Sequence, residues 1–168
     1  MPTVLYELAL MGLPSDDQVR EVEQHLLKGI EPFGLTLGKE VAWSTRVTSF
    51  EPSQRIAAGI VFFGAEGVSD VGLKPILHHG IPIVPVASTY GRVHAEIPEI
   101  LRPLNCLAYQ EDGPQRVATA LLECAGLLPR QRRVFVSYRR NESREVALQL
   151  FDVLSARHFR SEERRVGK

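Results

Sequence analysis

The sequence lacks most of the features that would place it in a specialised class of protein. Its 168 residues contain only two cysteines, Cys106 and Cys124, too few for a disulfide framework or a cysteine-based metal site. No apolar run approaches the roughly 20 residues of a membrane span, and the first four residues lack the basic start of a signal peptide. Basic and acidic residues number 20 each, so no basic excess indicates nucleic-acid binding. These absences predict a cytoplasmic protein with no metal ion, no nucleic-acid partner and no membrane contact.

Several motifs of common α/β activities are missing as well. There is no Gly-x-Gly-x-x-Gly or Gly-Lys-Ser pattern for nucleotide phosphates, and no Gly-x-Ser-x-Gly surrounds Ser88 as a hydrolase would require. A phosphoacceptor domain needs an aspartate after its third strand, where this chain has Gly64. His78 and His79 are adjacent and diverge by about 100° on a helix, so they cannot hold one metal ion.

The first part of the chain alternates short β-like runs with helical runs. Strands are predicted at residues 4–10, 41–44, 59–63, 81–86 and 106–109. Strands separated by helices are typical of a parallel sheet, because parallel neighbours need long crossover connections. Five such units fit an α/β, doubly wound, flavodoxin-like sheet with strand order 2-1-3-4-5. We therefore predict one complete domain over residues 1–128.

The predicted helices are marked by caps and prolines. Ser15, followed by Asp16 and Asp17, predicts an N-cap and an acidic first turn. Further helices are predicted at residues 52–58, 71–79, 96–104 and 114–126. Pro82 and Pro85 remove hydrogen-bond donors from the fourth strand, which predicts either distortion or an edge position there.

A second structural unit is predicted to begin after a linker at residues 129–132. The apolar run at 134–136 reads as a strand, and Asn141 or Ser143 would cap a following helix. Val146 and Leu150 begin the apolar stripe of that helix. One strand and one helix bury too little surface to offset the entropy of ordering them, so we expect residues 133–159 to be a loosely held, truncated domain opening.

The last residues, 160–168, show no apolar periodicity. Their string resembles translated sequencing-adapter read-through, which predicts a non-native tail with no part in the fold. The alternative is a genuine charged C-terminus that is frayed and solvated.

Residues 134–143 resemble box 1 of the bacterial Toll/interleukin-1 receptor (TIR) domain family. The family opens with a hydrophobic strand, then Ser-Tyr, then charged residues and a helix. One departure is Asn141, where bacterial members often carry an acidic residue. Residues 80–86 are similar to the family's Gly-x-x-x-Ile-Pro-Val strand, and residues 96–101 to the Leu-Pro segment that follows it.

The resemblance implies two activities for a parent protein that signals or acts in bacterial immunity. TIR domains assemble with one another or with copies of themselves, and some cleave NAD to release nicotinamide. The positions that match the family near its nucleotide site are Ser137, Tyr138, Arg139 and Arg140. The catalytic glutamate of the family lies on a helix well past box 1, beyond the end of this chain. The resemblance thus implies a fragment without cofactor or NAD nucleosidase activity, and leaves two roles open for the parent protein, assembly alone or assembly with NAD as a substrate.

The first domain is interpreted as an inactive relative used for recognition or assembly. Lys74 and Pro75 stand where a catalytic glutamate would be sought, and Glu66 lies earlier, in a loop. Two alternatives remain, a sensor of a nucleotide-like ligand and a purely non-enzymatic scaffold. A ligand would bind beyond the carboxyl ends of the strands. The loops there are residues 11–15, 64–70 and 88–92.

Overall fold

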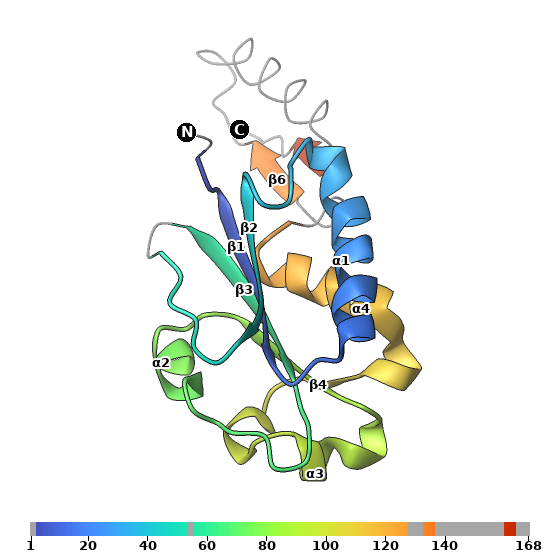
Figure 1. Cartoon of the computed structure of the whole chain (residues 1–168). Helices are drawn as coiled ribbons and strands as arrows, with labels where there is room; N and C mark the ends of the chain where they lie inside the picture. Colours follow the sequence, from blue (N-terminus) through green and yellow to red (C-terminus); the bar gives the residue numbers. More distant parts are fainter. Residues whose placement is uncertain (1–2, 54–55, 128–132, 137–159, 164–168) are drawn as a thin grey trace. The chain divides into compact units, whose positions relative to one another are not determined.

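The computed structural model describes residues 3–53, 56–127, 133–136 and 160–163 (Figure 1). The chain divides into two units, Met1–Leu127 and Leu128–Lys168. The first unit contains the predicted sheet and its helices, and the second contains a separate pair of strands.

Five parallel strands form the centre of the first unit, in the order β2-β1-β3-β4-β5. They are β1 (Tyr6–Gly12), β2 (Val41–Val47), β3 (Ala57–Phe63), β4 (Ile83–Ala87) and β5 (Leu107–Ala108). This is the predicted doubly wound, flavodoxin-like fold, and β2 lies at the edge. The central strand β1 is buried over four consecutive residues, because a strand covered on both faces carries apolar side chains at successive positions.

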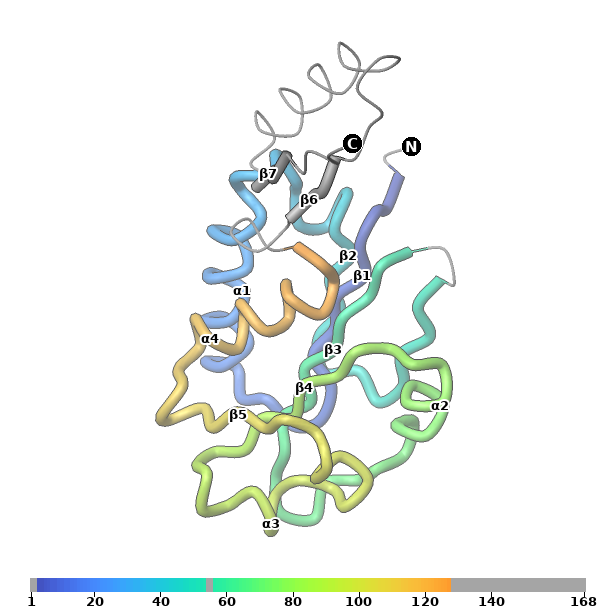
Figure 2. Tube along the Cα trace, turned by 180° about the vertical axis from the view of Figure 1, so that it is seen from behind, coloured from blue at the N-terminus to red at the C-terminus, as the bar shows by residue number. Residues whose placement is uncertain are grey.

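Two long helices cover one face of the sheet. These are α1 (Asp16–Ile30) and α4 (Tyr109–Cys124), which lie side by side in Figure 2. Ser15 starts α1 as predicted: its Oγ accepts a hydrogen bond from the Gln18 backbone N–H at 3.2 Å, and the Gln18 side chain accepts one from the Ser15 N–H at 2.8 Å. In α4 the regular helix begins at Pro114, after a kink at Gly113. Between helices and sheet lie buried aliphatic side chains, among them Leu8, Leu10, Leu26, Val61 and Leu121.

The other face is covered by shorter pieces. They are α2 (Leu73–His78), α3 (Val93–Glu96) and the 3₁₀ turns η2 (Tyr90–Arg92) and η3 (Glu99–Leu101). A further 3₁₀ turn, η1 (Glu31–Phe33), follows α1 directly. A second core cluster lies under the short pieces, with Ile60, Phe62, Leu73, Ile76 and Leu101 among its members. The predicted helix at 96–104 is broken at Pro98, whose preceding residue Ile97 is extended.

The prediction of a helix at residues 52–58 is wrong over the residues that the structure describes. Residues 51–53 have no regular structure, and β3 already begins at Ala57. Ala57 pairs with Tyr6 and Ala58 with Glu7. This strand pairing overrides the helix propensity of the two alanines, which is a weak preference on its own.

The fourth strand is not at an edge, because β4 lies between β3 and β5. Its prolines are tolerated for a geometric reason. The carbonyl oxygens of Pro82 and Val86 accept hydrogen bonds from the β3 side, from Ile60 N–H and Gly64 N–H. Backbone groups alternate along a strand, so the N–H that Pro85 lacks would point to the opposite side. There, pairing with β5 starts only at Val86.

The second unit holds two parallel strands, β6 (Arg133–Val136) and β7 (Arg160–Glu163). The first confirms the strand predicted at 134–136. The second places residues 160–163 of the predicted tail in a strand, and the non-native origin of the tail stays a prediction. The linker at 129–132 and the predicted helix after Ser143 lie outside the described residues.

Candidate functional site at the carboxyl edge of the sheet

The loops that follow β1, β3 and β4 meet at one edge of the sheet, because these three strands are neighbours. The backbone of Gly12 lies directly against the end of β3. Its φ is +79°, and a Cβ there would lie 2.0 Å from the carbonyl oxygen of Phe63. The same oxygen accepts a hydrogen bond from the Leu13 N–H at 3.0 Å. Only glycine fits at position 12, and the first loop is therefore fixed against the end of β3.

The loop after β3 is fixed against the segment that follows β4. The Gly64 N–H donates to the Val86 carbonyl at 2.8 Å. A Cβ at Gly64 would lie 2.6 Å from the carbonyl oxygen of Glu96 and 2.5 Å from the Ile97 side chain. The absence of a side chain at position 64 thus allows α3 to pack directly on this loop.

Glu96 connects the polar groups of this edge. Of the residues whose burial the structure describes, it is the one with a charged side chain that is buried. Its carboxylate accepts hydrogen bonds from the Ser88 N–H and the Ser88 Oγ, both at 2.7 Å, and from Arg92 Nε at 3.1 Å. Desolvation raises the pKa of Glu96. The hydrogen bonds from Ser88 and the ion pair with Arg92 outweigh that effect and hold the pKa below its ordinary value. Glu96 is therefore a charged anchor for the β4–α3 connection.

Arg92 links this anchor to the neighbouring loop. Its second guanidinium nitrogen, Nη2, lies 3.0 Å from the Glu66 carboxylate, so the loops at 64–70 and 88–92 are joined by an ion pair. The Glu66 side chain is 79% exposed and that of Arg92 is 50% exposed. Water screens such a pair, and its contribution to stability is small.

Tyr90 is held at the same edge from the other side. Its hydroxyl donates to Asp112 at 2.7 Å, and the Ala108 N–H donates to the same carboxylate oxygen at 2.7 Å. The Ala108 N–H first, and then the Tyr90 hydroxyl, hold the pKa of Asp112 below its ordinary value. The Tyr90 ring remains half exposed, at 52%. A large amphipathic side chain is thus presented to solvent with its polar end already fixed.

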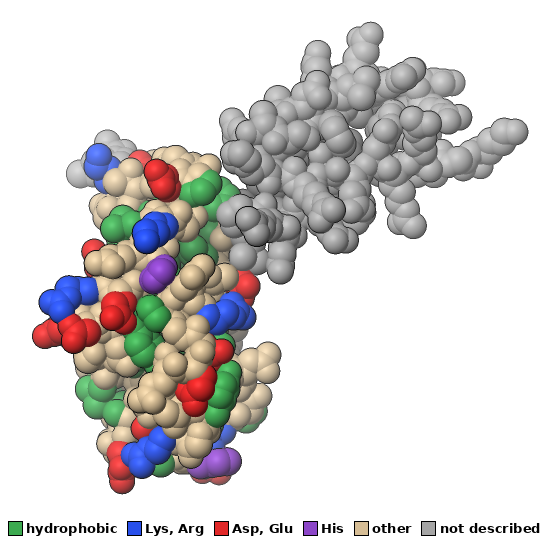
Figure 3. Space-filling model, turned by 90° about the vertical axis from the view of Figure 1, so that its right-hand side faces the viewer, with side chains coloured by type: hydrophobic (Ala, Val, Ile, Leu, Met, Phe, Trp, Pro, Cys, Tyr) green, Lys and Arg blue, Asp and Glu red, His purple; other side chains and the backbone are tan. Residues whose placement is uncertain are grey.

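Exposed apolar side chains are concentrated in these loops. Leu13 is 64% exposed and Val71 is 73% exposed, and together with Tyr90 they follow β1, β3 and β4. In sequence, Asp70 precedes Val71 directly and Arg92 follows Tyr90 by two residues. On the face seen in Figure 3, acidic and basic side chains are also interspersed, with no extended patch of one sign.

The site residues predicted from the TIR resemblance, Ser137, Tyr138, Arg139 and Arg140, lie outside the described residues. Of the loops predicted to form a site, the structure joins 64–70 with 88–92 through Glu66 and Arg92. Glu96 was missed as a site residue. Its spacing of four from Arg92 is a signal that was present in the sequence.

Nucleophile and metal chemistry find little support in the described part of the chain. Burial raises the pKa of the Cys106 thiol, and it raises that of Cys124 to about 11. Both cysteines are therefore neutral thiols at physiological pH and weak nucleophiles. Within those same residues, no group of three or more His, Cys, Asp or Glu side chains is placed to hold a metal ion.

No protein-family model matches this sequence, and no curated protein matches it either. None of the helices in the described ranges is long and apolar enough to cross a bilayer. The geometry of the carboxyl edge is therefore the main ground for a functional proposal.

Proposed function

We propose that the first unit is a recognition and assembly domain of a bacterial TIR-type signalling or defence protein, and that it pairs with a second copy of itself through the carboxyl edge. One observation carries the proposal. The edge where related sheets bind ligands is occupied by the protein's own Glu96–Arg92–Glu66 network, while Leu13, Val71 and Tyr90 are exposed in the segments that follow β1, β3 and β4.

The composition of this edge favours a protein partner. Interfaces combine exposed aromatic and aliphatic side chains with a polar rim, and tyrosine is enriched among residues that contribute most to binding. Tyr90 suits this role because its hydroxyl is already bound to Asp112, so little side-chain freedom remains to be lost on association.

The charges favour a second copy of the same chain. In a two-fold symmetric pair, each copy presents the same patch to the other. Glu66 and Arg92 lie within one patch and carry opposite charge. Their ion pair can therefore be exchanged between copies, with Arg92 of one copy facing Glu66 of the other, without leaving a charge unpaired.

The same carboxylates disfavour a nucleotide at this edge. A phosphate here would face Glu66 and Glu96, and the guanidinium that could bind it is already paired with both. The loop at 64–67 has a glycine at each end but no phosphate-binding motif. The sensor of a nucleotide-like ligand is thus the second candidate, supported only by that glycine-rich turn.

Sedimentation velocity across a wide concentration series tests the assembly. We expect the mean mass of the wild-type chain to rise with concentration, and Tyr90→Ala and Leu13→Asp to keep it monomeric. Leu27→Asp is the matched control, since Leu27 is also an exposed leucine, 47% exposed, on α1. A wild-type chain that stays monomeric throughout would refute the proposal, as would self-association lost only in the Leu27 variant.

An NAD hydrolysis assay tests the inactive character of this chain. No position of the chain matches the catalytic glutamate of the resemblance, and α2 carries Lys74 and Pro75 where that residue would be sought. We expect no release of nicotinamide from NAD. Turnover that disappears in Glu66→Ala would overturn this, and a thermal shift with NAD, ADP-ribose or a cyclic nucleotide would favour the sensor instead.

A further inference from the structure

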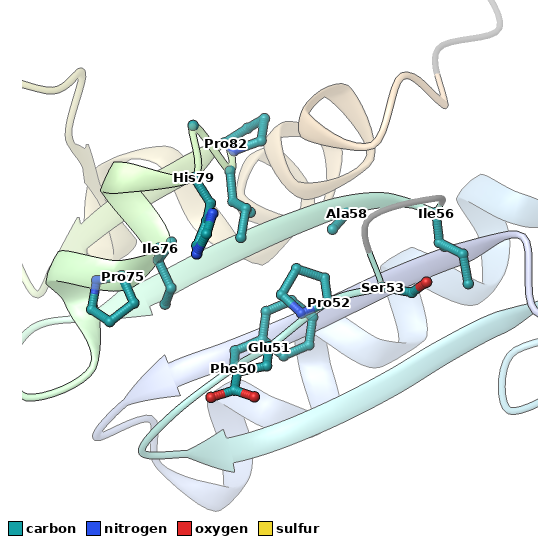
Figure 4. A pocket seen from close by; sticks show the side chains of 12 residues that line it. Phe50, Glu51, Pro52, Ser53, Ile56, Ala58, Pro75, Ile76, His79 and Pro82 are labelled. Carbon is teal, nitrogen blue, oxygen red and sulfur yellow. The ribbon is translucent and has the colours of Figure 1, made fainter.

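A cavity of about 530 Å³ lies at the opposite, amino edge of the sheet (Figure 4). One wall contains residues 50–53 and Ile56, which lie between β2 and β3, and the facing wall is the end of α2 with the turn into β4. The start of β3 forms its floor at Ala58. The volume falls in the range of small-molecule sites, roughly 300 to 1,000 Å³.

The cavity exists because this face of the sheet has less helix than the other. The described residues between β2 and β3 contain no helix, and α2 is only six residues long. The floor of the cavity also carries little side-chain volume. Gly59 faces α4 on the opposite side, where a Cβ would meet Cys124 and Leu121. Since side chains alternate along a strand, Ala58 presents only a methyl group to the cavity.

Backbone hydrogen bonds hold both walls in place. The Ser53 N–H donates to the Glu7 carboxylate at 2.9 Å, which ties the β2–β3 connection to β1. On the facing wall, the His79 N–H donates to the Pro75 carbonyl at 3.0 Å, and the Ile81 N–H donates to the Ile76 carbonyl at 3.1 Å. Both walls are thus tied to the rest of the domain by hydrogen bonds.

The walls combine apolar and polar groups, and the apolar share is the larger. Pro52, Pro75 and Pro82 contribute rings without backbone donors, and Phe50 adds an aromatic surface. Figure 4 shows the His79 imidazole extending from its wall toward the opposite one. No lysine or arginine is among the described lining residues, and Glu51 is, so the site offers an anion little compensating charge.

We propose that this cavity binds a small, uncharged, flat apolar molecule with one hydrogen-bonding group, of the indole or phenol class, with His79 as its polar partner. Two facing walls of proline, aliphatic and aromatic side chains suit a ring between them. The imidazole supplies one directional contact, as is typical of apolar ligand sites. This site is independent of the assembly surface at the carboxyl edge.

A chemical-shift titration of the full chain with indole tests the site. We expect saturable shifts confined to amides of Ala58, Ile76, His79 and Ile81. Ala58→Phe fills the floor and should weaken binding by more than tenfold. Ala57→Phe is the matched control, because Ala57 is exposed and points to the other face of the sheet. Absence of saturation, shifts centred on the carboxyl edge, or full binding by a folded Ala58→Phe chain would each overturn the proposal.

A second pair of variants decides the matter if Ala58→Phe does not fold. His79→Ala should weaken indole binding by about threefold to tenfold through loss of one hydrogen bond, and leave toluene binding unchanged. His25→Ala should leave both unchanged, since His25 lies on α1 and does not line the cavity. Equal loss of indole and toluene, or equal effects of the two histidine variants, would overturn the assignment of the ligand class.

Discussion

The two faces of the sheet are built differently, and the difference explains where each candidate site lies. One face is covered by α1 and α4, which are long and pack directly on the strands. The other is covered by short helices, turns and a connection without regular structure. Pro98 contributes to this, because it separates α3 from η3 and its preceding residue Ile97 is extended. The long helices cover the core cluster on the first face completely. The short elements on the second face leave a cavity and a group of loops uncovered.

The largest effect is expected when side-chain volume is added to each face of the sheet at adjacent residues of β3. Such a pair of variants tests whether the two faces are packed differently. Gly59→Val places a Cβ 2.8 Å from Cys124 Cβ and 2.9 Å from the Leu121 carbonyl oxygen, so α4 must move. We expect a loss of about 3 kcal/mol in the free energy of unfolding, measured by chemical denaturation.

Ala58→Val is its matched control, since it adds a similar group to the next residue but toward the cavity. We expect a change within about 0.5 kcal/mol, because the cavity has room for it and β-branched residues favour strands. If both variants lost the same stability, the two faces would be packed alike and the distinction would fail.

A smaller effect is expected at the loops of the carboxyl edge, from Glu96→Gln. The neutral amide of glutamine cannot replace the carboxylate that accepts hydrogen bonds from Ser88 and Arg92. We expect the free energy of unfolding to fall by about 2 kcal/mol at neutral pH. The pKa of Glu96 is lowered in the folded state, so its contribution is complete above the pKa of the unfolded chain and disappears as pH falls through the folded pKa. The stability gap between wild type and variant should therefore close in acid.

Denaturation curves of both proteins across an acidic pH series measure that gap. Asp112 also has a lowered pKa and destabilises both proteins in acid, so only their difference reports Glu96. A gap that stays constant down to strongly acidic pH would show that the Glu96 carboxylate has the same pKa in the folded and unfolded states.

The parts of the fold that sequence patterns predicted are those fixed by neighbours in the chain. Ser15 and Gln18 cap α1 within one turn, and the glycine-bounded run before Gly64 forms β3 as expected. The wrong helix before Ala58 has a non-local cause, because pairing of β3 with β1 joins residues far apart in sequence and no local pattern encodes it. The anchor at Glu96 was within reach of a local pattern, since Arg92 lies four residues before it and Ser88 eight. The approach of α3 to Gly64, by contrast, joins distant residues and was not predictable from local spacing.

The smallest loss of stability is expected at the N-termini of α1 and α2, which lie on opposite faces of the sheet. Ser15→Ala removes the side-chain acceptor of the capping box of α1, and we expect the free energy of unfolding to fall by about 1 kcal/mol.

The matched change on the other face is Ser69→Ala. The Oγ of Ser69 accepts a hydrogen bond from the Val71 N–H at 3.1 Å, just before α2, and Val71 is exposed. The α2 N-cap is Gly72, without a side-chain cap, so this loss should stay within about 0.5 kcal/mol. Thermal denaturation of both variants would measure the contrast. An equal loss would mean that α2, short as it is, depends on its starting turn as much as α1 does, and that the second face is held by its helix rather than by the loops around it.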